Sequence, residues 1–366
     1  FINYGLRAKE REVYDFSPSD YGTYCHKIFD DFFKGVYENN IDWNTIDREF
    51  IQREVEKLTA KMSEKSNFIL ESSPKYKYFS SITQKNIVES IEIMAEQVRR
   101  GNFIPTGFEK EFGDESIKPI SYTLKNGKDI KLVGKIDRID VFKGENSDFL
   151  RIIDYKSSKR DIDLNQVYAG LQLQLFVYMN AILSSNKDRY KPAGLFYSDF
   201  TTNLVGFETY SKMLDMNDDS FYSEKLKKNK LTGFVIKDME LLKNLDKTLE
   251  ENRLTSEILP IKLKSKGQEI GAGTLGLTTD EFEIVNEFVL NKTKDICEEI
   301  YDGNIDIKPF RYKDKKPCDY CKYKSICRFD IKHNKYNNIK NLVTKDKPNE
   351  VFEKMELKNK EKRGEK

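Results

Sequence analysis

Three charged side chains on two expected strands could form one catalytic site. The segments 130–142 and 149–156 are expected to be strands. Because side chains two apart on a strand share a face, Asp154 and Lys156 project together, and Asp137 can reach them from the neighbouring strand. Two carboxylates and one ammonium group suit a hard divalent cation beside a phosphodiester. This arrangement is typical of a metal-dependent nuclease.

The neighbours of Asp154 and Lys156 argue against an ordinary surface ion pair. Both residues share a strand face with Leu150 and Ile152, which draws that face toward the interior. Buried charges without partners are costly. We therefore expect a metal ion or a substrate phosphate beside them.

Asp137 is expected to be the metal ligand of its strand, and Asp140 a bystander. Asp137 shares a face with Ile139 and Val141, so it is again a charge on an apolar face. Asp140 projects from the opposite face, where we expect a local ion pair with Arg138.

The chain has two histidines, and one of them could join this site. His26 lies near the start of a helix expected over residues 17–38, which opens with a Ser17 cap. Imidazole is a good ligand for Mn²⁺, although an isolated histidine is more often an ordinary, partly buried side chain. His333 lies in a Lys-rich stretch and is interpreted as solvated.

Gln174 and Tyr178 stand four residues apart on an amphipathic helix expected over 164–183, so they share one face. Most of that face is core packing. The amide and the phenol could instead steer Lys156 or contact a bound strand, and the residues alone leave both interpretations open.

Cys318, Cys321 and Cys327 have the spacing of a metal or iron–sulfur site. Tetrahedral zinc and a [4Fe–4S] cluster each need a fourth ligand. Cys25 adjoins His26, and consecutive helical residues point about 100° apart, so it is a poor candidate if His26 faces the active site. Cys297 is interpreted as a core cysteine. The fourth ligand therefore remains open.

Composition limits the class of protein. The 366 residues suffice for one large domain or two modest ones, and 34% are charged although the net charge is only +2. Any basic surface must therefore be local. No apolar run approaches the ~18 residues of a membrane helix, and five unevenly spaced cysteines indicate a reducing cytoplasm.

The pattern along the chain predicts an α/β fold in five parts. We expect helices up to about residue 100, strands and a hairpin at 125–128, a Lys-rich insertion, and a long helix over about 280–301. The parts are 1–100, helical and carrying His26; 101–210, the catalytic core; 211–279, the insertion; 280–335, a helix with the cysteine lobe; and 336–366, a charged tail expected to be disordered.

Together these residues resemble the PD-(D/E)xK nuclease superfamily in its RecB-like branch, and within it the C-terminal nuclease domains of the AddB subunits of AddAB helicase–nucleases. The resemblance covers residues 1 to about 330. It rests on an ordered series of motifs: Tyr21-Gly22 with Cys25-His26, Glu109 with Glu111-Phe112-Gly113, Gly134 to Asp140, Asp154 to Ser157, Tyr168 with Gly170-Leu171, Leu173-Gln174 with Tyr178, Pro192 to Tyr197, and the three terminal cysteines.

The resemblance implies roles for these positions. His26, Asp137 and Asp154 would bind the catalytic Mg²⁺, for which Mn²⁺ can substitute, and the backbone carbonyl of Tyr155 would add a contact. Lys156 would orient the attacking water, and Gln174 and Tyr178 match a QxxxY motif that organises the site and the DNA strand. The implied fold is a restriction-endonuclease-like core: a mixed central sheet flanked by helices, with N-terminal helices and a C-terminal cysteine-rich lobe.

The family also carries a [4Fe–4S] cluster on four cysteines, of which Cys318, Cys321 and Cys327 would be the last three. The chain starts at Phe1 without an initiator Met, so we expect an excised fragment whose first cluster cysteine lies upstream. The cluster would then be incomplete or absent in the fragment.

The expected function is Mg²⁺-dependent exonuclease cleavage of single-stranded DNA from a duplex end, in double-strand break processing and recombination repair. The strand would be fed by an AddA-like helicase subunit, since the chain has no GxxxxGK[ST] phosphate loop of its own. Two alternatives are a stand-alone, Cas4-like nuclease and a non-catalytic, Fe–S-stapled DNA-binding module.

Overall fold

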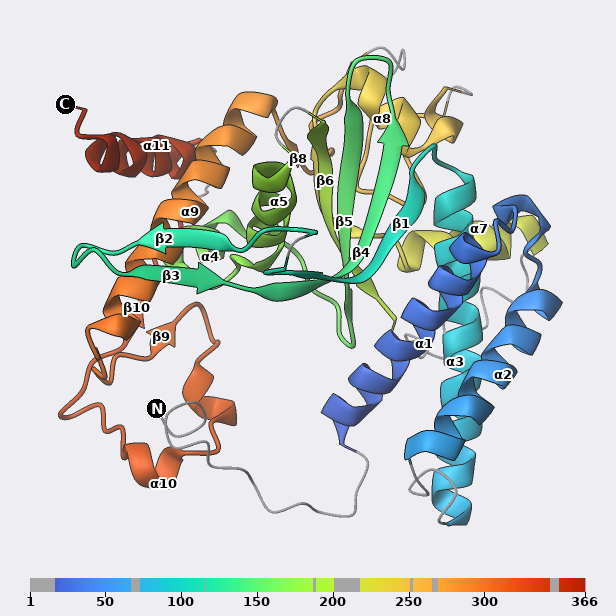
Figure 1. The fold of residues 1–366 in the computed structure, drawn as a ribbon, viewed down its shortest axis with the longest axis horizontal. Coiled ribbons are helices and arrows are strands. Elements are labelled where there is room, and N and C mark those ends of the chain that lie inside the picture. Colours follow the sequence, from blue (N-terminus) through green and yellow to red (C-terminus); the bar gives the residue numbers. More distant parts are fainter. Residues whose placement is uncertain are drawn as a thin grey trace.

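A six-stranded mixed sheet forms the centre of the protein (Figure 1). The computed structural model describes residues 17–66, 73–114, 116–186, 189–200, 218–250, 253–264, 269–342 and 349–365. The strand order is β1 (Ile104–Phe112), β4 (Gly134–Lys143), β5 (Asp148–Lys156), β6 (Tyr190–Asp199), β7 (Thr232–Ile236) and β8 (Gly276–Leu277). Strands β5/β6 and β7/β8 pair in parallel and the other neighbours antiparallel. The predicted α/β fold with a mixed central sheet flanked by helices is confirmed.

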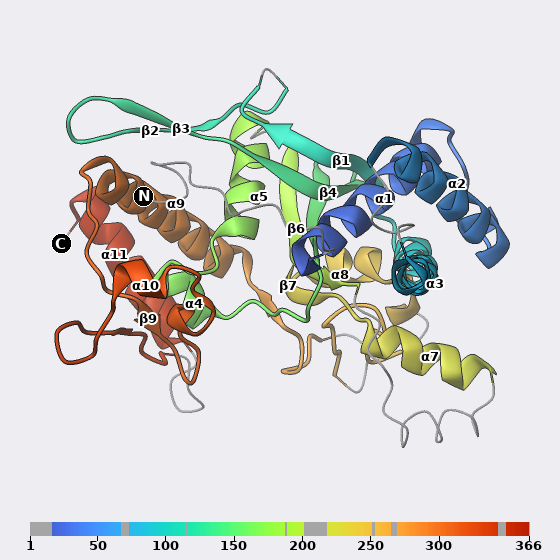
Figure 2. The ribbon, with the colours of Figure 1, turned by 90° about the horizontal axis from the view of Figure 1, so that it is seen from below.

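Three N-terminal helices pack beside the β1 edge of the sheet (Figures 1 and 2). They are α1 (Pro18–Glu38), α2 (Arg48–Ser66) and α3 (Pro74–Arg99), with a 3₁₀ turn η1 (Trp43–Thr45) between the first two. The Ser17 side chain and Asp20 form a reciprocal capping box that fixes where α1 begins. Helix α1 then buries an apolar stripe that includes Phe29, Phe32 and Phe33, and it packs on β1 and β4.

One face of β4 and β5 holds a fully buried ion network. Arg138 donates two hydrogen bonds of 2.7 Å to the two oxygens of Asp140, and Arg151 donates a third at 2.9 Å. The Arg138 guanidinium also lies 4.5 Å from the ring centre of Phe33 on α1. The predicted local pairing of Asp140 with Arg138 is therefore confirmed, and Arg151 on the next strand is an unforeseen third member.

The helix expected over 164–183 is two helices, which corrects the sequence interpretation. Helix α4 (Leu164–Ala169) ends at Gly170, whose φ of 86° lies in the left-handed region. Helix α5 (Gln174–Ser185) starts four residues later and packs on β5 and β6. The apolar period runs across the break, which is why the pattern predicted one continuous helix.

The stretch expected to be an insertion contributes to the central sheet. It contains α7 (Asp218–Lys228), β7, α8 (Met239–Leu245) and η2 (Lys247–Leu249), and β7 pairs antiparallel with β6. Residues 211–217, 251–252 and 265–268 of this stretch, and residues 201–210 before it, lie outside the described residues. The five-part division of the chain remains a prediction.

The C-terminal part is built on the long helix α9 (Thr279–Tyr301), which packs against α5. The hairpin of β2 (Ile120–Thr123) and β3 (Asp129–Leu132) projects over α9 (Figure 1), where Lys125 pairs with Glu298 at 2.9 Å. The cysteine lobe follows with β9 (Phe310–Arg311), η3 (Pro317–Tyr320), α10 (Lys324–Cys327) and β10 (Asn337–Asn338).

The charged tail differs from the expectation of disorder. Residues Glu350–Arg363 form helix α11, which packs against α9 and α4. Val351, Met355 and Asn359 are buried on one face of it. The prediction from composition was wrong because the few buried residues of α11 stand among many lysines and glutamates. No helix within the described ranges combines the length and the apolar character that crossing a membrane requires.

Candidate metal centre

Strand register aligns three carboxylates across β1, β4 and β5. Phe108 pairs with Arg138 and Lys110 with Ile136, so Glu109 lies opposite Asp137 on the neighbouring strand. On β4 and β5, which are antiparallel, Arg138 pairs with Ile153. One residue further along, Asp137 therefore lies opposite Asp154. Side chains directly across an antiparallel pair share a face. Glu109, Asp137 and Asp154 therefore form a row on one face.

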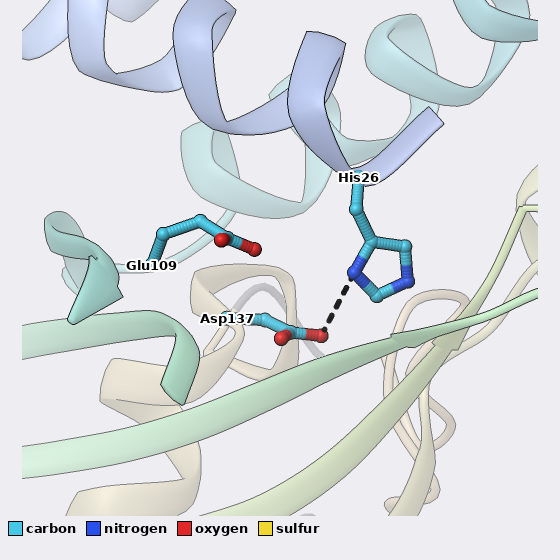
Figure 3. A group of neighbouring side chains, drawn as sticks. All are labelled: His26, Glu109 and Asp137. Atoms are coloured by element: carbon cyan, nitrogen blue, oxygen red, sulfur yellow. Dashed lines mark ion pairs between the residues drawn. The ribbon is translucent and has the colours of Figure 1, made fainter. Parts of the chain in front are cut away.

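Asp137 is the middle member of this row and is held from two sides. The backbone N–H of Tyr155 donates to its Oδ2 at 2.9 Å, and Nδ1 of His26 lies 3.4 Å from the same oxygen. His26 projects from α1 toward the two strand carboxylates (Figure 3). Its ring is packed edge-on against Tyr155 and Phe200, with centroids 5.6 and 5.7 Å away.

Glu109 completes a cluster whose donor atoms suit a divalent cation. One ligand atom each from His26, Glu109 and Asp137 lies within 4.8 Å of the other two, the one such group of three among the described residues (Figure 3). Glu109 has a φ of 45°, a left-handed backbone that is uncommon away from glycine. Lys135 forms an ion pair with its carboxylate.

Asp154 stands beside this cluster and is held by its own partners. Lys156 forms an ion pair with its Oδ2, and Nε2 of Gln174 donates to its Oδ1 at 3.1 Å. The same amide nitrogen lies 2.7 Å from the Tyr178 hydroxyl, and Lys156 donates to the Gln174 carbonyl at 3.4 Å. The fold thus brings Asp154, Lys156, Gln174 and Tyr178 into one hydrogen-bonded group.

The electrostatics of the site reflect crowded carboxylates in a partly buried place. Burial, and next the charge of Asp154, raise the pKa of Asp137 to about 7. Burial also raises the pKa of Asp154, against the opposing effect of Lys156. Burial and the positive charge of Lys156 lower the pKa of His26 to about 4. The imidazole is therefore neutral near pH 7, which leaves a ring nitrogen able to act as a ligand.

No role was predicted for Glu109, although it stands in one of the motifs of the resemblance. A glutamate on a half-exposed strand is common, and the sequence carries no sign of the register that sets it opposite Asp137. His333, interpreted as solvated, is exposed in the cysteine lobe. Asp140 belongs to the buried network on the other face, as expected of a bystander.

No cysteine among the described residues belongs to this cluster. Cys318, Cys321 and Cys327 are half-buried free thiols of the C-terminal lobe, and within the described residues they do not form a group as close as that of His26. Cys25 is fully buried in the core face of α1, where burial raises the pKa of its thiol to about 12. Cys297 packs against the hydrophobic core from α9. Neither supplies the lobe with a fourth thiol.

Comparison with known proteins agrees with the geometry. A sequence model of the PD-(D/E)XK nuclease superfamily matches residues 1–328. Similar proteins include three that are named as the B subunit of an ATP-dependent helicase/deoxyribonuclease. That of Clostridioides difficile (strain 630) is 37% identical over 93% of this chain and 30% of its own length. The protein of Caldanaerobacter subterraneus subsp. tengcongensis is 37% identical over 94% of this chain and 30% of its own length. That of Thermoanaerobacter sp. (strain X514) is 39% identical over 93% of this chain and 29% of its own length.

The chain spans about 30% of the length of these curated relatives. The superfamily match covers most of the chain, including every strand carboxylate of the site. The predicted resemblance is therefore confirmed, and the chain belongs to the PD-(D/E)XK nuclease superfamily.

Proposed function

We propose that this chain is the nuclease domain of a helicase–nuclease that processes DNA double-strand breaks for recombination repair. It would act as an Mg²⁺-dependent exonuclease on a single strand supplied by a helicase subunit, in the cytoplasm. The observation that carries the proposal is the carboxylate row with His26 beside Asp137 and Lys156 beside Asp154. The names of the relatives support a partner with helicase activity.

The donor atoms present fit a hard divalent cation. Carboxylate oxygens are the ligands that Mg²⁺ prefers, and one neutral imidazole is well tolerated by Mn²⁺. His26, Glu109 and Asp137 would hold the ion, with Asp154 and the carbonyl of Tyr155 at its side. When bound, such an ion stabilises the negative charge that develops on a phosphodiester during hydrolysis.

The chain's own residues would prepare the reaction around that ion. Lys156 lies between the Asp154 carboxylate and the Gln174 carbonyl, so its ammonium group is oriented and can hold a water or a phosphate oxygen by hydrogen bonds. Gln174 bridges Asp154 and Tyr178, which fixes both the carboxylate and the phenol. Tyr178 is then the group of this set best placed to contact the strand.

The cysteine lobe would bind a [4Fe–4S] cluster through Cys318, Cys321 and Cys327. The spacing of these three cysteines supports the cluster, and one further ligand must be supplied from elsewhere. The cluster is expected in the full-length protein and to be incomplete or absent in this chain alone, so purification of the full-length protein without oxygen, with measurement of iron, sulfide and zinc, tests this. Iron and sulfide in equal amounts support the cluster, and stoichiometric zinc without iron contradicts it.

Cleavage of labelled single-stranded DNA tests the enzyme proposal. The 366-residue chain is expected to hydrolyse the strand with Mg²⁺ and not with EDTA, and Asp154→Ala should abolish the activity. Asp148→Ala is the matched control, because Asp148 lies at the far end of β5 and pairs with Arg189 at 3.3 Å. Equal behaviour of wild type and Asp154→Ala would favour the non-catalytic DNA-binding module instead.

A further inference from the structure

An exposed aromatic stripe lies on the first turns of α3. Tyr78 and Phe79 are 69% and 38% exposed, and Ile82 on the next turn is 36% exposed. With Lys75 these residues follow the i, i+3, i+4, i+7 spacing of one helix face. Large aromatic side chains usually bury most of their surface, so two adjacent exposed rings indicate a binding surface. We call Tyr78 and Phe79 the α3 stripe.

A continuous row of ring contacts joins the α3 stripe to the metal centre. The Phe79 ring lies 6.0 Å from Tyr21 on α1, and Tyr21 lies 6.1 Å from Phe200 at the end of β6. Phe200 lies 5.7 Å from His26. These three centroid distances follow one another from Phe79 to His26, so the two rings can be no farther apart than their sum. That sum is the length of about five stacked nucleotides at ~3.4 Å each.

The charge around the α3 stripe suits a polyanion. From Pro74 to Val88 the helix carries three lysines, Lys75, Lys77 and Lys85, and no carboxylate. All three lysines are exposed. The chain as a whole is nearly neutral at +2, so these four turns are a local basic surface with aromatic rings between the lysines.

We propose that the α3 stripe is a stacking platform for the bases of a single nucleic-acid strand whose backbone enters the metal centre. This inference rests on the proposed nuclease function and specifies how the substrate is held. Rings between cations are the usual construction of surfaces that bind single strands, because every base offers a face for stacking. In a duplex those faces are already stacked, so the platform selects single strands.

Binding without hydrolysis isolates this contact. A fluorescent single-stranded oligonucleotide and the same strand with abasic sites are titrated with the chain in EDTA, and anisotropy reports the affinity. The Tyr78→Ala/Phe79→Ala double variant should bind the normal strand at least about tenfold more weakly. It should bind the abasic strand as wild type does, because that strand offers phosphates and no bases.

Matched variants separate stacking from loss of structure. Tyr37 lies at the C-terminal end of α1, far along the helix from Tyr21, and its ring is 48% exposed. Tyr37→Ala should leave the affinities for the normal and the abasic strand unchanged. Tyr78→Phe and Phe79→Tyr keep the rings and should restore wild-type binding. In a Trp43→Phe background, which removes the only tryptophan, the fluorescence of Tyr78→Trp should be quenched by the normal strand and not by the abasic one.

Two results would overturn the inference: unchanged affinity of the double variant for the normal strand, or an equal loss for both strands. Failure of the proposed function is a separate result, since it is read from hydrolysis in Mg²⁺. If Asp154→Ala stops cleavage while the α3 stripe variants bind normally, only the stacking platform is wrong. If the strand is bound through the stripe and never hydrolysed, only the nuclease proposal is wrong.

Discussion

The backbone N–H of Tyr155 donates a 2.9 Å hydrogen bond to the Asp137 carboxylate, and this bond joins β5 to β4 at the candidate metal centre. Tyr155 lies between Asp154 and Lys156 in the sequence, so its main chain belongs to the site while its side chain projects to the opposite face. There its ring lies 5.2 Å from Phe29 on α1. The packing of α1 and the position of Asp137 are therefore coupled through one residue.

Glu109→Gln should weaken the binding of a divalent cation. The substitution keeps the size of the side chain and removes one of the negative charges of the cluster. We expect the Kd for Mn²⁺ to rise at least about tenfold, the scale on which ligand-sphere changes act, measured by isothermal titration calorimetry. Glu111→Gln, two residues along the same strand and exposed, is the control. Equal affinities in the two variants would exclude Glu109 as a ligand.

His26→Gln should change metal preference as well as affinity. Imidazole favours Mn²⁺ over the harder Mg²⁺, and Nδ1 of His26 is 3.4 Å from Asp137. The variant should therefore lose more Mn²⁺-supported than Mg²⁺-supported cleavage, measured as the metal concentration giving half-maximal rate. His333→Gln, in the exposed stretch of the cysteine lobe, should match wild type. A parallel loss for both metals would argue that His26 acts by packing alone.

Asp140→Ala should destabilise the fold strongly. Asp140 is the shared partner of Arg138 and Arg151, and all three side chains are fully buried. Removing it leaves two buried guanidinium groups without a counter-charge, a change that typically costs about 3–5 kcal/mol. Urea unfolding gives the free energy. Asp306→Ala removes an exposed partner of Lys308 and should change it by less than about 0.5 kcal/mol.

The grouping of these charges could be predicted from the sequence because strand periodicity sets which side chains share a face. Asp137, Asp154 and Lys156 were placed together on this argument, and the pairing of β4 with β5 brings them together. Glu109 could not be found in this way. Its place depends on the pairing of β1 with β4, which joins segments about thirty residues apart, and register is a tertiary property.

A helix boundary could be predicted where a side-chain cap marks it in the sequence. It was missed where only the backbone conformation ends the helix. Ser17 and Asp20 mark the start of α1 in the sequence. The end of α4 depends on the left-handed conformation of Gly170, and a single glycine within an apolar period is also tolerated inside a helix. Helix α11 was missed because few of its residues are buried.

Gly170→Ala should test that helix end. The φ of 86° is unfavourable for alanine, so we expect a loss of about 1 kcal/mol in the free energy of unfolding. Gly22→Ala is the control with the opposite sign. Gly22 lies within α1 and an added methyl group would meet nothing within 4 Å, so alanine should stabilise by about 0.5–1 kcal/mol. Both are measured by urea unfolding, and equal signs would contradict the assigned helix end.

Tyr312→Phe should loosen the attachment of the cysteine lobe in a pH-dependent manner. The Tyr312 hydroxyl donates a 2.7 Å hydrogen bond to Asp163, the residue that caps α4. Burial alone would raise the pKa of Asp163, but hydrogen bonds from Tyr312 and Asn165 outweigh it and lower the pKa. A carboxylate with a lowered pKa stabilises the fold above its unfolded pKa of about 3.9. That contribution is lost as the pH falls through the lower, folded value.

Tyr312→Phe should therefore lower the free energy of unfolding by about 1 kcal/mol at pH 7. The difference from wild type should shrink below about pH 4. Burial raises the pKa of Tyr312 itself to about 12, so the phenol remains a donor throughout this range. Urea unfolding of both proteins at pH 7, 5 and 3 measures the difference, with 91%-exposed Tyr320→Phe as the control. A difference that stays constant down to pH 3 would show that the Tyr312 hydroxyl stabilises the lobe without the Asp163 charge.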